Sequence, residues 1–287
     1  MAQITPAMVK ELRDKTGAGM GDCKKALTET DGNMQEAIEF LRKKGAASAA
    51  KRADRSANEG TIFASTDADG KNAVILEINC ETDFVAMNED FINFVNQVGN
   101  ALLNNNVSST EELMKLNIGN DSIEGLYNEI LAKFSEKIEV ARFEKLSGEG
   151  FIGSYIHAGN KLGVLVETTA ASMNEEAHAK IRDIAMQIAA MNPQFVDRSE
   201  VDQDTLNKEK EIYRTQAIES GKKEEIADRI AEGRLEKFYS ESCLIEQSFV
   251  KDSSKTINDV IKEISDLTGS ETKVVKFVRY ALGESED

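Results

Sequence analysis

The fold is decided by a stretch in the first third of the chain, AVILEINCETDFVA (Ala73–Ala86). Its first part, Ala73–Ile78, is a nearly continuous apolar run, which is typical of a buried strand. Beyond it, apolar residues recur at the spacing of a helix, at Phe91, Phe94, Val95 and Val98. Asn79–Ala86 therefore forms a strand-to-helix corner. Such corners usually carry polar turn formers, but this one carries the large apolar residue Phe84.

The chain repeats this pattern about ninety residues later, without a gap. Glu59-Gly60 recurs as Glu149-Gly150, and the strand residues Val74–Glu77 recur as Val164–Glu167. The helix keeps its register as well: the four apolar positions given above align with Ile181, Ile184, Ala185 and Ile188. Such a repeat predicts two subdomains of one design, each built from strand, turn, strand, corner and helix.

The two copies differ at the corner. The second copy reads Ser172-Met173-Asn174-Glu175, which matches a capping box, in which the Ser and the Glu three residues later bond free amides at a helix start. The first copy keeps a hydroxyl in Thr82 but has Phe84 and Val85 at the positions of Asn174 and Glu175. A Phe is more often a core residue, but this internal comparison favours an apolar projection that acts on a partner.

Composition limits the class of protein. The 287 residues, 40% of them hydrophobic, suffice for two or three modest domains. No apolar run reaches the length of a membrane span, and the N-terminus has neither the basic start nor the apolar segment of a signal peptide. Widely separated cysteines without metal-ligand spacing fit a reducing compartment; they are Cys23, Cys80 and Cys243. We therefore expect a cytoplasmic protein without a cofactor or metal.

The charge is unevenly distributed. The net charge of −16 argues against nucleic acid as a direct partner, because phosphate contacts need clustered Lys and Arg. Residues 1–57 carry 11 Lys and Arg against 8 Asp and Glu, so this region has a net charge of +3 and the remainder −19. The sequence predicts a basic N-terminal region on an acidic body.

Residues 1–45 are predicted to form a module of three short helices, of which the first begins with Thr5 as cap and Pro6 as first helical residue. The Gly-Ala-Gly-Met-Gly run that follows this helix is not preceded by a strand. It is therefore interpreted as a turn with an exposed Met20 rather than a phosphate-binding loop. Residues 46–58, Ala-rich and basic, are predicted to be a linker, with a solvated helix as the alternative.

The rest of the chain is predicted to be the core with one insertion. Residues 110–135 have a helical pattern, and Ile138–Phe143 alternates like a strand. A strongly charged segment with a break at Ser220-Gly221 predicts an antiparallel helical hairpin, either a dimerisation arm or an isolated coiled coil. A helix after Lys255 and the strand Val274–Tyr280 close the chain. The predicted boundaries are 59–146 for core subdomain 1, 147–200 for core subdomain 2, 201–242 for the hairpin and 243–287 for the C-terminal part that completes the core.

No catalytic site emerges from the sequence. His157, in the turn of the second repeat, and His178 lie far from any nucleophile motif. No metal-binding constellation or Gly-rich phosphate loop is present, and the acidic residues form no pair that stands apart from a solvated surface. The sequence therefore predicts a binder of protein and not an enzyme.

Several segments, in order along nearly the whole chain, resemble the elongation factor Ts family, the guanine-nucleotide exchange factors for elongation factor Tu in bacterial translation. The matching segments are Lys15–Met20, Asp22–Leu27, Asn79–Ala86, Ser154–His157, Glu225–Ala227 and Glu232–Arg234. The resemblance implies an α+β fold: an N-terminal ubiquitin-associated-like three-helix module, a duplicated two-subdomain α+β core and a helical-hairpin (coiled-coil) insertion.

The resemblance also implies a partner and a set of site residues. It assigns entry into the nucleotide domain of elongation factor Tu, and displacement of its magnesium, to Thr82, Asp83, Phe84 and Val85. Further contacts to the partner are Arg13, Met20, Lys24 and His157. The expected partner is elongation factor Tu, GDP-bound or nucleotide-free, without nucleic acid or membrane, and a homodimer through the hairpin stays open. The alternative is a passive adaptor or holdase that binds protein through the three-helix module, which leaves the apolar corner unexplained.

Overall fold

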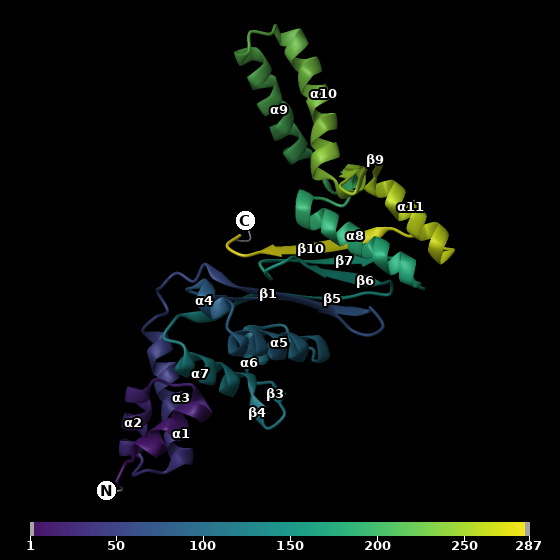
Figure 1. Ribbon diagram of the computed structural model, residues 1–287. Helices are drawn as coiled ribbons and strands as arrows, with labels where there is room; N and C mark the ends of the chain where they lie inside the picture. The colour runs from purple at the N-terminus through teal and green to yellow at the C-terminus, as the bar shows by residue number, and fades with distance from the viewer. Residues whose placement is uncertain (1–2, 285–287) are drawn as a thin grey trace.

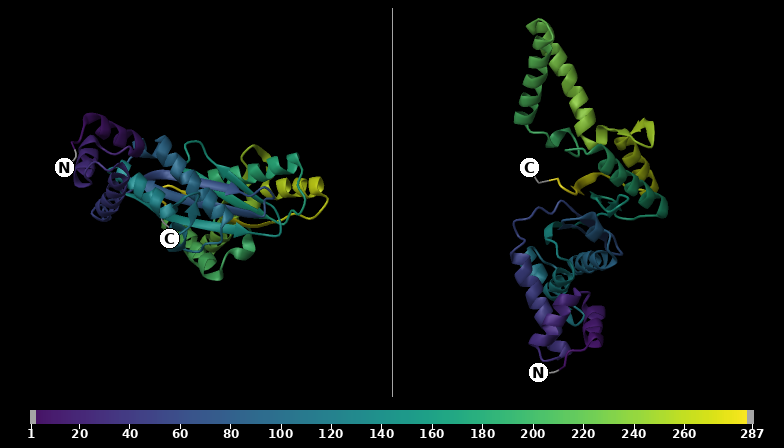
Figure 2. Two further views of the ribbon diagram at one scale, coloured as in Figure 1. Left: turned by 90° about the horizontal axis from the view of Figure 1, so that it is seen from below. Right: turned by 60° about the vertical axis from the view of Figure 1, so that its left-hand side comes forward.

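The computed structural model describes residues 3–284. Two three-stranded antiparallel sheets face each other, and helices cover their outer faces (Figure 1). A three-helix module lies at one end of this core and a helical hairpin projects from the other, as the right-hand view in Figure 2 shows. The α+β class is confirmed. Within residues 3–284, no helix combines the length and apolarity that a membrane crossing requires.

The N-terminal module consists of α1 (Pro6–Thr16), α2 (Met20–Glu29) and α3 (Met34–Ala50). Helix α1 begins as predicted, because Oγ1 of Thr5 accepts a hydrogen bond from the backbone N of Met8 at 3.3 Å. It ends at Gly17, whose φ of +67° is the left-handed conformation that favours glycine. The small core of the module is apolar and buried; its fully buried members include Leu12, Cys23, Ala26, Leu27 and Ala37.

Helix α3 is longer than predicted, since it continues to Ala50 through the first part of the predicted linker, 46–58. Alanine is the best helix former, so this Ala-rich stretch extends the helix without a break. Packing also supports it: α3 lies against α7 (Ile123–Lys133), and a Cβ on Gly45 would come within 2.9 Å of the backbone N of Ala132. The prediction of a linker from residue 46 is wrong for this part.

The first sheet has the order β1 (Glu59–Thr66), β2 (Asn72–Cys80) and β5 (Ile138–Ser147). Side chains of β2 alternate between its two faces, as the period of two in a strand requires. One set packs with α5 (Glu89–Asn104) in the outer core; it comprises Val74, Leu76 and Ile78. Ala73 and Ile75 belong instead to the layer between the two sheets.

The second sheet has the order β10 (Val274–Ala281), β7 (Leu162–Thr168) and β6 (Ile152–Ile156), with α8 (Glu175–Met191) and α11 (Ile257–Thr268) on its outer face. The prediction that the C-terminal strand completes a sheet is confirmed. The sheets approach closely at Gly163, where a Cβ would lie 2.7 Å from Cγ2 of Ile62 in the first sheet. This contact requires glycine.

The helical pattern predicted over residues 110–135 is confirmed only in part, because the helix is interrupted. The chain forms α6 (Thr110–Met114), a small hairpin of β3 (Asn117–Ile118) and β4 (Asp121–Ser122), and then α7. Gly119 has a φ of +63°, which permits the tight turn. Apolar residues on both sides of the break, Leu113 and Ile123, are buried in the same core, so the apolar spacing alone did not reveal the interruption.

The predicted helical hairpin is confirmed as α9 (Gln203–Glu219) and α10 (Glu224–Ser242). Its seam is narrow, and the residues buried in its outer part are small; they are Ala217, Ala227 and Ala231. Short 3₁₀ turns flank the hairpin, η1 (Arg198–Glu200) before it and η2 (Leu244–Glu246) after it. A small hairpin, β8 (Ser248–Phe249) and β9 (Asp252–Thr256), then leads into α11.

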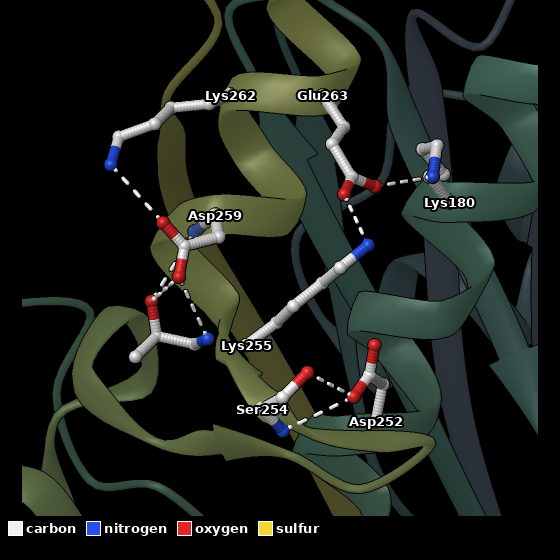
Figure 3. Close-up of polar contacts among 8 residues, drawn as sticks. Lys180, Asp252, Ser254, Lys255, Asp259, Lys262 and Glu263 are labelled. Carbon is white, nitrogen blue, oxygen red and sulfur yellow. Dashed lines mark hydrogen bonds and ion pairs between the residues drawn. The ribbon is translucent and has the colours of Figure 1, made fainter.

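The start of α11 carries a capping box (Figure 3). Oγ1 of Thr256 accepts from the backbone N of Asp259 at 3.3 Å, and Oδ2 of Asp259 accepts from the backbone N of Thr256 at 3.0 Å. Lys262 donates to the other carboxylate oxygen at 3.2 Å. The bonds from Thr256, followed by that from Lys262, lower the pKa of Asp259 to about 2 from its ordinary 3.8. One turn later Glu263 bridges Lys180 and Lys255.

We expect this cap to make stability depend on pH between 3.8 and about 2. In that interval the unfolded chain binds a proton at Asp259 that the folded protein does not, so acidification favours unfolding. A carbon NMR titration of the Asp259 carboxyl should give a midpoint near 2. In urea unfolding measured at several pH values, Asp259→Asn should remove the part of the pH dependence of stability that Asp259 causes. A midpoint near 3.8 would contradict the role of the cap.

Candidate protein-binding site

The corner of the first repeat contains a single helical turn, α4 (Asp83–Ala86), between β2 and α5. Thr82 is its cap, since Oγ1 of Thr82 accepts from the backbone N of Val85 at 3.4 Å. Val85 and Ala86 are buried under this turn, whereas the side chain of Phe84 is 80% exposed. Of these two neighbouring apolar residues, Phe84 projects into solvent and Val85 packs in the core and anchors the turn. An aromatic side chain exposed on an anchored turn is suited to insertion into a partner.

Sequence reasoning missed Met87, which ends this turn and is 66% exposed. It lies three residues after Phe84 in helical backbone, a spacing that places two side chains on neighbouring positions of a helix surface. This spacing could have identified Met87 from the sequence as a neighbour of Phe84 on the same surface. Asp83 is exposed beside them. The corner therefore presents an apolar pair next to a carboxylate.

The second copy differs in structure as well as in sequence. Asn174, and not Ser172, caps α8: Oδ1 of Asn174 accepts from the backbone N of Ala177 at 2.8 Å. The predicted Ser172 capping box is wrong, because Asn is at least as good a cap as Ser and lies directly before the first helical residue, Glu175. Phe84 thus occupies the position at which the second copy has its helix cap, and the long helix α5 begins only at Glu89.

A carboxylate from a distant loop holds the corner in place. Glu136, between α7 and β5, accepts hydrogen bonds at Oε2 from the backbone N atoms of Glu81 (3.2 Å) and Thr82 (3.0 Å). Its Oε1 accepts from Oγ1 of Thr82 at 2.6 Å. In return, Glu81 accepts from the backbone N of Lys137 at 2.6 Å, and this bond, together with the ion pair to Arg55, lowers the pKa of Glu81. Nothing local in the sequence pointed to Glu136, which is 54 residues from Thr82.

The cysteine beside the corner is not a nucleophile. Cys80 is fully buried, and its Sγ donates to the carbonyl O of Thr82 at 3.2 Å. Burial, with the nearby charge of Glu136, raises the pKa of Cys80 to about 12. Because the thiolate is the reactive form, this thiol stays inert at neutral pH.

His157 lies exposed in the turn between β6 and β7, with its Nδ1 2.9 Å from the hydroxyl of Tyr155. In the same turn, Nζ of Lys161 is 2.6 Å from Oε2 of Glu59, the residue that pairs with Cys80 in the first sheet. The turn of His157 and the corner of Phe84 therefore lie at the same end of the two sheets.

The remaining predicted contacts lie on the N-terminal module. Met20 and Lys24 are exposed one turn apart on α2, so they share a face, and Arg13 is exposed on α1. The structure joins this module to the corner through the segment after α3, because Arg55 pairs with Glu81 at 3.1 Å. The module forms a second surface, distinct from the corner.

The corner carries two exposed apolar side chains, Phe84 and Met87, beside the carboxylate of Asp83. Over residues 3–284 no three His, Cys, Asp or Glu side chains are grouped so that they could hold a metal ion. What the arrangement offers is a fixed turn that presents apolar side chains, together with an exposed histidine turn and the three-helix module.

Comparison with known proteins places this architecture in a family. The family model described as "Elongation factor TS" matches residues 81–284. An elongation factor Ts of Prosthecochloris aestuarii is 48% identical over 288 residues, covering 99% of this chain and 100% of its own. The elongation factor Ts of Chloroherpeton thalassium is 47% identical, over 99% of this chain and 100% of its own length. That of Clostridium perfringens is 46% identical, over 98% of this chain and 93% of its own length. The chain belongs to the elongation factor Ts family of translation elongation factors.

Proposed function

We propose that the protein is a guanine-nucleotide exchange factor that binds GDP-bound elongation factor Tu in the cytoplasm and promotes GDP release. The observation that carries this proposal is the exposed Phe84 on a turn whose next residue, Val85, is buried. Family membership supports a role in translation elongation. An apolar side chain held clear of its own core is suited to wedge between elements of another protein.

In this mechanism Phe84, with Met87 beside it, inserts between helices of the nucleotide domain that pack fully only when nucleotide and magnesium are bound. The insertion moves the groups that hold magnesium. Because magnesium bridges the phosphates to the protein, displacing its ligands weakens GDP binding without any contact to the base. Thr82 and Val85 fix the turn, and Asp83 lies beside the wedge.

The broader contacts supply the rest of the binding free energy. Arg13, Met20 and Lys24 on the three-helix module would grip the same domain of the partner, and His157 would contact another domain. Binding of the factor and of nucleotide are then linked reciprocally: each loosens the other by the same factor.

The test is release of a fluorescent GDP from purified elongation factor Tu, with and without this protein. We expect acceleration, and we expect GDP or GTP added to the isolated complex to dissociate it, because of this linkage. Size-exclusion chromatography of the complex with and without nucleotide measures the second effect. An adaptor or holdase would bind without accelerating release and would be indifferent to nucleotide, so that combination of results would overturn the exchange function.

A further inference from the structure

We propose that Glu136 is a positioning residue that holds the turn carrying Phe84 in its binding orientation; this inference rests on the exchange function proposed above. Glu136 does not lie in the exposed corner itself. It reaches the corner from the loop between α7 and β5 and bonds the two residues that precede α4.

The three hydrogen bonds of Glu136 fix both the backbone and the side chain of the cap. Oε2 accepts hydrogen bonds from the backbone N–H groups of Glu81 and Thr82, and Oε1 accepts one from the hydroxyl of Thr82. The same hydroxyl oxygen accepts from the backbone N of Val85. A continuous chain of bonds therefore runs from the distant carboxylate into the turn that carries Phe84.

The turn needs an external support. Helix α4 has four residues, and a single helical turn is not stable in isolation, since it fixes several dihedral angles for few hydrogen bonds. Its backbone bonds are few: the N of Ala86 donates to the O of Thr82, the N of Met87 to the O of Asp83 and the N of Asn88 to the O of Val85. Phe84 is exposed, so its own side chain adds little packing that would hold the turn. Orientation fixed before association lowers the entropy cost of binding.

Glu136 is itself held rigidly. Arg52, which is buried although charged, donates from Nη1 to the carbonyl O atoms of Phe134 and Glu136. The neighbouring Lys137 donates its backbone N–H to the carboxylate of Glu81. The Glu136 carboxylate of the loop therefore bonds the corner, and the Glu81 carboxylate of the corner bonds the loop. Arg52, in the segment after α3, bonds the same loop.

The first experiment compares Glu136→Ala with Glu136→Gln in the GDP-release assay. The Gln amide oxygen can accept both backbone N–H groups while its NH₂ donates to the hydroxyl of Thr82, so the geometry survives without the charge. We expect Glu136→Ala to slow release toward the rate of Phe84→Ala, and Glu136→Gln to stay within about twofold of wild type. Glu139→Ala is the matched control. Glu139 lies opposite Asn79 in the β2–β5 ladder, and its half-exposed carboxylate pairs with Nζ of Lys137 at 3.0 Å instead of bonding the cap of the turn. No loss in Glu136→Ala would overturn the proposal.

The second experiment is a double-mutant cycle. If Glu136 acts through Phe84, then adding Glu136→Ala to Phe84→Ala causes no further loss of exchange, although Glu136→Ala lowers the free energy of urea unfolding equally in both backgrounds. Equal fold losses in the two backgrounds would show that Glu136 acts elsewhere. Thr82→Val removes the hydroxyl partner of Glu136 with little change of shape. It should also slow exchange in the wild type but not in Phe84→Ala, and it replaces Glu136→Ala in this experiment if that variant does not fold.

The third readout does not depend on exchange. The chain contains no tryptophan, so Phe84→Trp introduces a single fluorescent probe at the tip of the turn. We expect time-resolved anisotropy to show faster local motion of this probe when Glu136→Ala is added, but not when Glu136→Gln is added. Unchanged local motion would overturn the positioning role. Failure of the wild type to release GDP would overturn only the exchange function.

Discussion

Phe84→Ala is expected to slow the release of GDP from elongation factor Tu, as stimulated by the protein, by about 10- to 100-fold. This range follows from the about 1.5–3 kcal/mol gained by burying a Phe side chain, at about 1.4 kcal/mol per tenfold. The complex should still form, because the contacts of the three-helix module and of the His157 turn are intact. The stability of the free protein should not change, since the side chain is exposed. Stopped-flow release of fluorescent GDP measures the rate, and urea unfolding checks the fold.

Ile226→Ala is the matched control for this variant. Ile226 is also a large exposed apolar residue, but it lies on α10 in the hairpin, far from the corner. We expect its GDP-release rate to equal that of the wild type. If Phe84→Ala kept the full rate, the wedge would be refuted. Binding by the N-terminal module, through Arg13, Met20 and Lys24, would then have to carry the exchange.

The parts of the fold that the sequence predicted correctly are those with a local period. The alternation in β2 and the helical spacing from Phe91 to Val98 depend on neighbours in the chain, and the repeat allowed each copy to support the other. The comparison of the two copies also identified Phe84 as exposed, which no propensity scale would favour.

The errors arose where tertiary contacts compete with local patterns. Apolar spacing over residues 110–135 continued through the β3–β4 hairpin because both flanks face one core, and α3 continued past Gly45 because it packs on α7. Glu136 could not be found, since its two partners, Glu81 and Thr82, lie 55 and 54 residues away and it looks like any surface glutamate in the sequence. The ubiquitin-associated-like character of the module and a homodimer through the hairpin remain predictions.

A buried ion pair within the first sheet, which the sequence did not suggest, lies against the second sheet. Glu77 on β2 is 3% exposed, and its Oε2 lies 2.8 Å from Nε of Arg142 on the neighbouring β5. The guanidinium of Arg142 stacks on the ring of Tyr280 on β10, with 4.1 Å from Cζ to the ring centroid, and Nη2 donates to the carbonyl O of Ala281. A single arginine therefore connects two strands of the first sheet, β2 and β5, to β10 of the second sheet.

Arg142→Ala is expected to lower the free energy of unfolding by about 3–5 kcal/mol, because it leaves the charge of Glu77 buried without a partner. That is a large share of the about 5–15 kcal/mol that stabilises a typical domain. Urea unfolding followed by circular dichroism measures the loss. Glu77→Leu combined with Arg142→Met should recover most of it, since an apolar pair of similar volume removes the unpaired charge.

An exposed ion pair between β5 and β10 provides the control. Lys276 on β10 pairs with Glu144 on β5, and both side chains are partly in solvent. Lys276→Ala should cost less than about 1 kcal/mol, because exposed pairs are screened and gain little over their hydration. If Arg142→Ala cost no more than Lys276→Ala, the burial of Glu77 would not be what makes Arg142 important. The apolar layer between the sheets, which includes Ile62, Ile75 and Leu165, would then contribute more to stability than this ion pair.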